Sequence, residues 1–154
     1  DMMRYINKKG RDNARTPMQW NDTENAGFTT GTPWFTVNPN YKEVNVAEQE
    51  KDPDSILNFY KHLIQMRKEY PIIVYGSYKL LYPDHKTAFV YERMLEDEKL
   101  LVACNFSAEE LELEVPAEFV QKEAELLISN YHEAKISEKL VLRPYEARVY
   151  RITK

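Results

Sequence analysis

The sequence predicts a mainly β protein with one long helix, in which an antiparallel β-sandwich follows that helix and a long aromatic-rich loop. Two changes of pattern along the chain support this prediction. Apolar residues recur at helical spacing most clearly between residues 52 and 70, and from residue 72 onward they alternate with a period of two. The 154 residues are 43% hydrophobic and 30% charged, which is typical of a globular protein.

Residues 1 to about 51 are predicted to form an extended loop. Turn-forming residues are frequent there, as in Asn25-Ala-Gly27 and Asn38-Pro-Asn40. The first eight or so residues are expected to be the end of a helix that Gly10 terminates. A loop of this length is generally functional, and spaced aromatic side chains indicate that it packs onto another surface. These aromatic residues are Tyr5, Trp20, Phe28, Trp34, Phe35 and Tyr41.

The helix is predicted over residues 52–70. Asp52 suits the N-cap and Pro53 the first helical position, while Arg67 and the break at Pro71 mark the end. One face of this helix is strongly apolar, so the helix requires a large partner surface. Its members are Ile56, Phe59, Tyr60, Leu63 and Ile64.

Eight short segments after the helix are predicted as strands. Leu111–Val115 alternates cleanly between apolar and acidic residues, and Leu100–Cys104 is continuously apolar, as expected of a central strand. Short connections between so many strands favour an antiparallel sandwich. The predicted strands are Ile72–Tyr75, Ser77–Tyr82, Thr87–Leu95, Lys99–Asn105, Leu111–Val115, Ala124–Ser129, Lys139–Leu142 and Ala147–Ile152.

Charge and composition exclude several classes of function. The net charge is −4 and no basic stripe is visible, so we expect no nucleic-acid partner. No apolar run approaches the roughly 20 residues of a membrane span, so we expect no membrane contact. The one cysteine, Cys104, excludes an internal disulfide and fits a reducing compartment, which predicts a cytoplasmic protein without a signal peptide. An opening Asp indicates that the sequence starts within a longer one.

Most chemically versatile residues are best interpreted as structural. His62, His85 and His132 have no metal-ligand spacing, and Cys104 lies in an apolar strand, so no metal site is predicted. The four glycines lie too far apart for a phosphate-binding loop, and no cofactor is expected. No pair of carboxylates is placed to serve as the two catalytic groups of a glycosidase.

One segment, Arg11–Trp20, resists a purely structural interpretation. Its sequence, Arg-Asp-Asn-Ala-Arg-Thr-Pro-Met-Gln-Trp, is dense in side chains that form hydrogen bonds. Guanidinium groups beside Asp, Asn and Gln suit sugar hydroxyls or carboxylates. From the residues alone, a loop that binds a polar ligand and a clamp between domains are equally plausible interpretations.

The same decapeptide resembles the oligo-1,6-glucosidase and α-glucosidase group of glycoside hydrolase family 13. The resemblance continues in order along essentially the whole chain. Its further motifs are Asn25-Ala-Gly-Phe28, Pro33-Trp34, Val37–Glu43, Asp52-Pro-Asp-Ser55, Tyr75-Gly-Ser-Tyr78, Lys99-Leu-Leu-Val102, Asn105-Phe106 and Arg143-Pro-Tyr-Glu-Ala147.

This resemblance implies a fragment of a larger enzyme. Residues 1–71 would be the tail of a catalytic (β/α)₈ barrel, consisting of the loop after its eighth strand and its last helix, and residues 72–154 the C-terminal antiparallel β domain. The catalytic Asp nucleophile, Glu acid/base and second Asp of the family lie upstream, so no catalytic residue is assigned and the fragment is expected to be inactive. Without the missing barrel, exposed apolar surface is expected to favour self-association.

The resemblance also implies candidate substrate-binding residues. Arg11 corresponds to a residue that lines the glucose subsite, while Asp12 and Arg15 either bind substrate or brace the loop. Gln19 and Trp20 are interpreted as packing residues. In the parent enzyme, an oligosaccharide with α-1,6 (or α-1,4) bonds would be hydrolysed by double displacement with retention.

Several related enzymes, and one different class of function, are alternatives to oligo-1,6-glucosidase. Trehalose-6-phosphate hydrolase, dextran glucosidase, maltose-type α-glucosidase and sucrose isomerase carry close versions of the decapeptide, and Tyr75-Gly-Ser-Tyr78 favours oligo-1,6-glucosidase among them. A different class of function is a stand-alone β module that binds carbohydrate or protein. Such a module would expose aromatic residues on a sheet face, whereas 9 of the 19 aromatic residues here lie in the first 70 positions.

Overall fold

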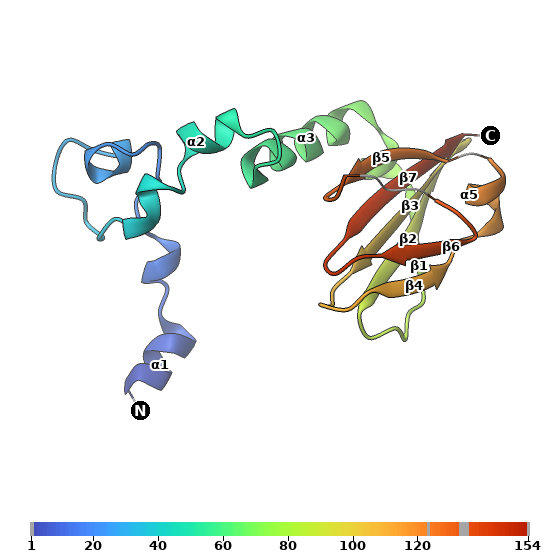
Figure 1. Ribbon diagram of the computed structural model, residues 1–154, viewed down its shortest axis with the longest axis horizontal. Helices are drawn as coiled ribbons and strands as arrows, with labels where there is room; N and C mark the ends of the chain where they lie inside the picture. The colour runs from blue at the N-terminus through green and yellow to red at the C-terminus, as the bar shows by residue number, and fades with distance from the viewer. Residues whose placement is uncertain (1, 123, 133–135, 154) are drawn as a thin grey trace. The chain divides into compact units, whose positions relative to one another are not determined.

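The computed structural model describes residues 2–122, 124–132 and 136–153, which form two compact units, Asp1–Gln65 and Met66–Lys154. The first unit is built from short helices and turns. Its α-helices are α1 (Met2–Lys9), α2 (Val46–Lys51) and most of α3 (Ile56–Glu69), and its 3₁₀ turns are η1 (Asp12–Ala14), η2 (Glu24–Gly27) and η3 (Pro39–Lys42). The second unit holds every strand that the described residues form (Figure 1).

The predicted antiparallel β-sandwich is confirmed. The larger sheet has the strand order β1-β2-β3-β7-β5, a two-stranded sheet pairs β4 with β6, and every pairing is antiparallel. The strands are β1 (Ser77–Leu81), β2 (Ala88–Leu95), β3 (Glu98–Asn105), β4 (Leu111–Glu114), β5 (Glu125–Ser129), β6 (Lys139–Leu142) and β7 (Ala147–Thr153).

The core of the sandwich lies between its two sheets. Alternation along β7 turns Arg148, Tyr150 and Ile152 inward, and β4 and β6 contribute apolar side chains from the opposite layer. The short helix α5 (Ala117–Gln121), which the sequence did not predict, closes one end with the fully buried Phe119. The core residues are Val90, Leu101, Ala103, Leu113, Phe119, Leu140, Leu142, Tyr150 and Ile152.

The strand predicted over Ile72–Tyr75 is wrong, because these residues form one helical turn, α4. The Tyr75 N–H donates to the Pro71 carbonyl at 2.8 Å, which closes the turn. The Arg93 guanidinium on β2 then donates to the carbonyls of Ile72 and Gly76, at 3.0 and 2.7 Å. Tertiary contacts therefore override the β preference of this branched apolar run.

The predicted start of the long helix is also wrong. Asp52 ends the unpredicted helix α2, and α3 begins at Ile56. The capping position belongs to Ser55, whose Oγ accepts from the Asn58 N–H at 3.2 Å. The early helix at Met2–Lys9 is confirmed, and the Gly10 N–H donates to the Ile6 carbonyl at its end; Asp1 lies outside the described residues.

Candidate functional site

Arg11, Asp12 and Arg15 lie on one turn of backbone. Asp12 opens the 3₁₀ turn η1, and Arg11 and Arg15 flank it. The Arg15 N–H donates to the Asp12 carbonyl at 2.9 Å, which closes the turn. All three side chains are exposed, and none forms a hydrogen bond or ion pair with another residue that the structure describes. The sequence therefore brings these three polar groups together, and their role in binding substrate stays a prediction.

The end of the Arg11–Trp20 segment is held by backbone hydrogen bonds on both edges. On one edge, the carbonyls of Gln19 and Trp20 accept from Val46 and Ala47 N–H at 3.0 Å each. On the other edge, the Trp20 N–H donates to the Ala26 carbonyl at 2.9 Å. The Gln19 side chain also donates to the Val44 carbonyl. The decapeptide is thus tied to the start of α2 and to the turn at Ala26.

Polar side chains cap α2 and join its C-terminal end to α3. Asn45 caps α2, since its Oδ1 accepts from the Glu48 N–H at 3.0 Å. At the other end of α2, the Ser55 Oγ donates to the Gln49 carbonyl at 2.6 Å, and the Asn58 Nδ2 donates to the same carbonyl at 3.0 Å. Such fully bonded groups fix one arrangement of the two helices.

An open groove of about 440 Å³ lies beside this junction in the first unit. Its lining is mostly apolar and includes Met18, Ile56 and Tyr60, with Gln19 as one of the polar members. Arg11, Asp12 and Arg15 do not line it. The exposed polar groups and the apolar groove are therefore separate features of the first unit.

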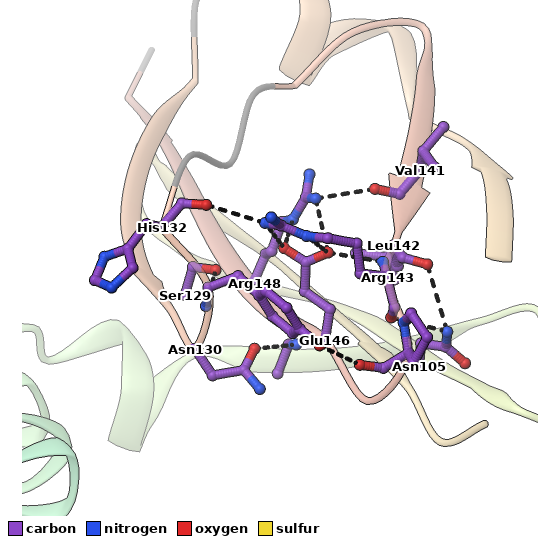
Figure 2. A network of polar contacts seen from close by, with 12 residues as sticks. Asn105, Ser129, Asn130, His132, Val141, Leu142, Arg143, Glu146 and Arg148 are labelled. Carbon is purple, nitrogen blue, oxygen red and sulfur yellow. Dashed lines mark hydrogen bonds and ion pairs between the residues drawn. The ribbon is translucent and has the colours of Figure 1, made fainter. Parts of the chain in front are cut away.

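The second unit contains a buried ionic network that sequence reasoning did not single out (Figure 2). Glu146 is 0% exposed and Arg148 is 6% exposed. The Glu146 carboxylate accepts from the Arg148 Nε at 2.7 Å, from the Arg143 side chain at 2.9 Å and from the Arg143 backbone N–H at 2.8 Å. The period-two alternation of β7 was the signal that could have placed Arg148 inside.

The network also ties the turn before β7 to neighbouring elements. The Arg148 guanidinium donates to the Val141 carbonyl on β6 at 2.9 Å. The Asn105 side chain at the end of β3 donates to the Arg143 carbonyl at 3.0 Å, and its backbone N–H donates to the Glu146 carbonyl at 2.8 Å. Glu146 thus sits where both sheets meet, which is a structural position.

The pKa of Glu146 follows from these contacts. Burial by itself raises the pKa of the carboxyl, because it disfavours the charged form. Hydrogen bonds from Arg143 and Arg148 outweigh burial, and the pKa is lowered from 4.5 to about 2. Glu146 is therefore ionised at neutral pH and is a poor proton donor.

Among the residues that the structure describes, the other titratable candidates do not come together in a site. Burial raises the pKa of the Cys104 thiol, which disfavours the reactive thiolate. His85 Nδ1 accepts from the Ala88 N–H at 2.9 Å and so shapes a turn. Within residues 2–122, 124–132 and 136–153 no cluster of three or more His, Cys, Asp or Glu side chains suits a metal ion. No described helix has the length and hydropathy to cross a bilayer.

Comparison with protein families divides the chain at nearly the point where the β-sheet begins. Residues 1–76 match the family described as alpha amylase, catalytic domain. Residues 78–149 match the family described as maltogenic amylase, C-terminal domain.

Curated relatives agree with these matches. The chain is 57% identical over 107 residues to an oligo-1,6-glucosidase of Parageobacillus thermoglucosidasius, an overlap that covers 70% of this chain and 19% of the relative. It is 46% identical over 110 residues to a trehalose-6-phosphate hydrolase of Bacillus subtilis, an overlap of 71% and 20%. The chain thus spans about a fifth of the length of the curated relatives it matches.

Solved structures match over more of the chain. The crystal structure of Bacillus licheniformis trehalose-6-phosphate hydrolase has a TM-score of 0.88 and 44% identity, over 99% of this chain and 28% of that one. Isomaltulose synthase from a Klebsiella species has a TM-score of 0.82 and 43% identity, over 92% and 25%.

Proposed function

We infer the function of this chain from one premise, namely that it belongs to the α-amylase family, glycoside hydrolase family 13. We propose that the chain forms the C-terminal part of a retaining α-glucosidase that hydrolyses the α-1,6 bonds of short oligosaccharides. In this proposal the first unit completes a catalytic barrel and the β-sandwich stabilises it, with the domains divided at residues 71 and 72.

Sequence identity to relatives supports the choice of an α-1,6-linked substrate. Identity to the oligo-1,6-glucosidases of Parageobacillus thermoglucosidasius and Bacillus cereus is 57%, against 46% to a trehalose-6-phosphate hydrolase over a similar length. Activity on α-1,4 bonds or on trehalose 6-phosphate is the alternative.

Arg11 is proposed to bind the glucose unit that is cleaved. Its guanidinium offers several N–H donors in a planar fork, which suits vicinal sugar hydroxyls. Hydrogen bonds from this cation to the sugar hydroxyls would hold the glucose unit in the orientation that the reaction requires. Asp12 and Arg15 share its turn and are proposed to orient it or to add contacts to the sugar.

We propose that the partner of this chain is the barrel portion of the same protein and that its location is cytoplasmic. The barrel portion of the same protein would cover the apolar face of α3, where Ile56 is 82% exposed. In its absence we propose that this face drives self-association. A reducing, cytoplasmic location suits the unpaired thiol of Cys104.

We expect the 154-residue chain and the protein made from the complete reading frame to differ in glucosidase activity. The 154-residue chain is expected to release no glucose from isomaltose, because the proposed catalytic carboxylates are not in it. The protein made from the complete reading frame is expected to hydrolyse isomaltose and p-nitrophenyl α-glucoside faster than maltose or trehalose 6-phosphate. Glucose release and the anomeric form of the first product, read by NMR, measure both expectations.

Two results would contradict this assignment. Turnover by the 154-residue chain, lost when its own carboxylates are changed, would place the catalytic groups inside it. A complete protein that prefers trehalose 6-phosphate would replace oligo-1,6-glucosidase by the alternative substrate.

A second function, carbohydrate binding by the sandwich itself, is favoured by one observation. Tyr91 on β2 lies beside two other aromatic rings, with ring centroids 5.2 Å from Tyr78 and 5.4 Å from Phe89. Tyr78 and Phe89 are exposed, and aromatic sheet faces of this kind can stack on sugar rings.

Affinity electrophoresis of the 154-residue chain in gels containing glycogen or dextran tests this second function. Our main proposal predicts no retardation relative to a gel without polysaccharide. Retardation that is lost in Tyr91→Ala, and kept in Tyr5→Ala outside the sheet, would favour the binding module instead.

A further inference from the structure

The backbone turns left-handed at three successive residues of the first unit. Asn25 has φ 52° and ψ 29°, Ala26 has φ 57° and ψ 26°, and Gly27 has φ 66°. We call Asn25–Gly27 the left-handed turn. L-residues avoid this region because Cβ crowds the following carbonyl, and Ala has no polar side chain to compensate. A run that includes Ala26 therefore needs strong support from its surroundings.

The surroundings of each of the three residues favour this conformation. Ala26 is 0% exposed. The Asn25 Nδ2 donates to the Thr29 and Gly31 carbonyls, at 3.2 and 3.1 Å, which fastens the loop after the turn. A Cβ on Gly27 would lie 2.6 Å from the Asn21 Oδ1, so the Asn21 side chain would have to move, and the positive φ would strain any L side chain there.

The left-handed conformation determines where the Ala26 carbonyl points. The Ala26 carbonyl accepts from two N–H groups, those of Trp20 at 2.9 Å and Asn21 at 3.2 Å. These donors stand at the end of the decapeptide, on the edge opposite its bonds to Val46 and Ala47. A right-handed or extended backbone at Ala26 would aim the carbonyl elsewhere and leave that edge unheld.

We propose that the left-handed turn is a positioning element for the sugar site, and that Asn25 and Gly27 are positioning residues that act through the Ala26 carbonyl. By fixing Trp20 and Asn21, the turn fixes the path of the decapeptide and hence the placement of Arg11. The proposal rests on the function proposed above. It also deepens that function, because it assigns a role to residues that carry no catalytic chemistry.

The test compares two identical substitutions in one loop, made in the protein from the complete reading frame. Gly27→Ala adds a methyl group where the φ is +66° and Asn21 blocks the space. Gly31→Ala adds the same group where the nearest side-chain atom is 3.8 Å away. We expect Gly27→Ala to raise KM for isomaltose at least tenfold and Gly31→Ala to change it less than twofold.

Further variants separate positioning from stability. Leu113→Ala removes a buried side chain from the β-sandwich and should lower Tm without raising KM. If Gly27→Ala does not fold, Asn25→Ala takes its place; it loses both side-chain hydrogen bonds and should raise KM in the same direction. The proposal would be overturned if Gly27→Ala, or Asn25→Ala in its place, lowered Tm as Leu113→Ala does but kept KM within twofold of wild type.

A second measurement keeps this test independent of the substrate. Hydrogen exchange on the 154-residue chain should show protected Trp20 and Asn21 amides in wild type and in Gly31→Ala, with at least tenfold faster exchange in Gly27→Ala. Unchanged exchange in Gly27→Ala would overturn the role of the turn. If the complete protein hydrolyses no glucoside, the proposed function fails, while the exchange data still decide whether the turn holds the decapeptide.

Discussion

Glu146→Gln is expected to destabilise the β-sandwich by about 3–5 kcal/mol, the cost typical of removing one member of a buried ion pair. The carboxylate is fully buried and neutralises Arg148, which is 6% exposed. A neutral amide would leave that guanidinium without its counter-ion in a medium of low dielectric constant. The amide would also present an N–H₂ group where the carboxylate now accepts from Arg143.

Urea denaturation of the 154-residue chain, followed by circular dichroism of the sheet, measures this effect. Glu112→Gln provides the matched control, since Glu112 pairs with Lys139 at 2.6 Å but both side chains are more than half exposed. This control should leave the denaturation midpoint nearly unchanged, because solvent screens exposed pairs. Equal midpoints for the two variants would contradict the structural role of the buried network.

The same carboxyl predicts how stability depends on pH. The pKa of Glu146 is about 2 in the folded chain against 4.5 as the ordinary value. A lowered folded pKa means that its contribution is complete above pH 4.5 and is lost as the pH falls toward 2. The loss is on the order of 3 kcal/mol, from 1.4 kcal/mol per unit. Glu146→Gln should show a shallower fall in stability between pH 4.5 and 2 than wild type does.

Arg11→Ala is expected to have the largest effect on catalysis. If Arg11 donates to the sugar as proposed, its removal should lower kcat/KM for isomaltose on the order of 10²-fold in the protein from the complete reading frame, because the sugar would lose a contact that orients it for reaction. Arg11→Lys should recover little of this activity, because an ammonium group lacks the planar fork. Circular dichroism should stay unchanged, since the side chain is exposed.

Arg4→Ala is the matched control for Arg11→Ala. Arg4 is an exposed arginine of α1, seven positions earlier in the chain, and lies outside the decapeptide. We expect its kcat/KM to remain within twofold of wild type. If Arg11→Ala also stays within threefold, the assignment of Arg11 to the glucose subsite is wrong.

The sandwich was predictable because its signals are local. A period of two in β4, β6 and β7 fixes which side chains turn inward, and short turns favour antiparallel pairing. The turn at Ile72–Tyr75 was not predictable from its own residues, because hydrogen bonds from Arg93, about twenty positions later, select helix over strand. Likewise, Ser55 displaces Asp52 as the cap because it bonds back to Gln49 on α2.

In the candidate site, too, some features could be predicted from neighbouring residues and others could not. Arg11, Asp12 and Arg15 are close in sequence, so their shared turn could be expected. The left-handed turn could not, because it is supported by hydrogen bonds to Asn21, Thr29 and Gly31, and an alanine in its centre is unfavourable by propensity. The ionic network joins residues of β6, β7 and the end of β3, and only the folded sheets bring them together.

Strand β1 stands at the edge of the five-stranded sheet and pairs on one side with β2. Its open side is a row of N–H and C=O groups that can template pairing with another chain. Lys79 is the one charged residue of this strand, while Tyr78 and Leu80 beside it are exposed. A charged side chain on an edge strand opposes such pairing, so we expect Lys79→Val to aggregate faster than wild type, as measured by light scattering.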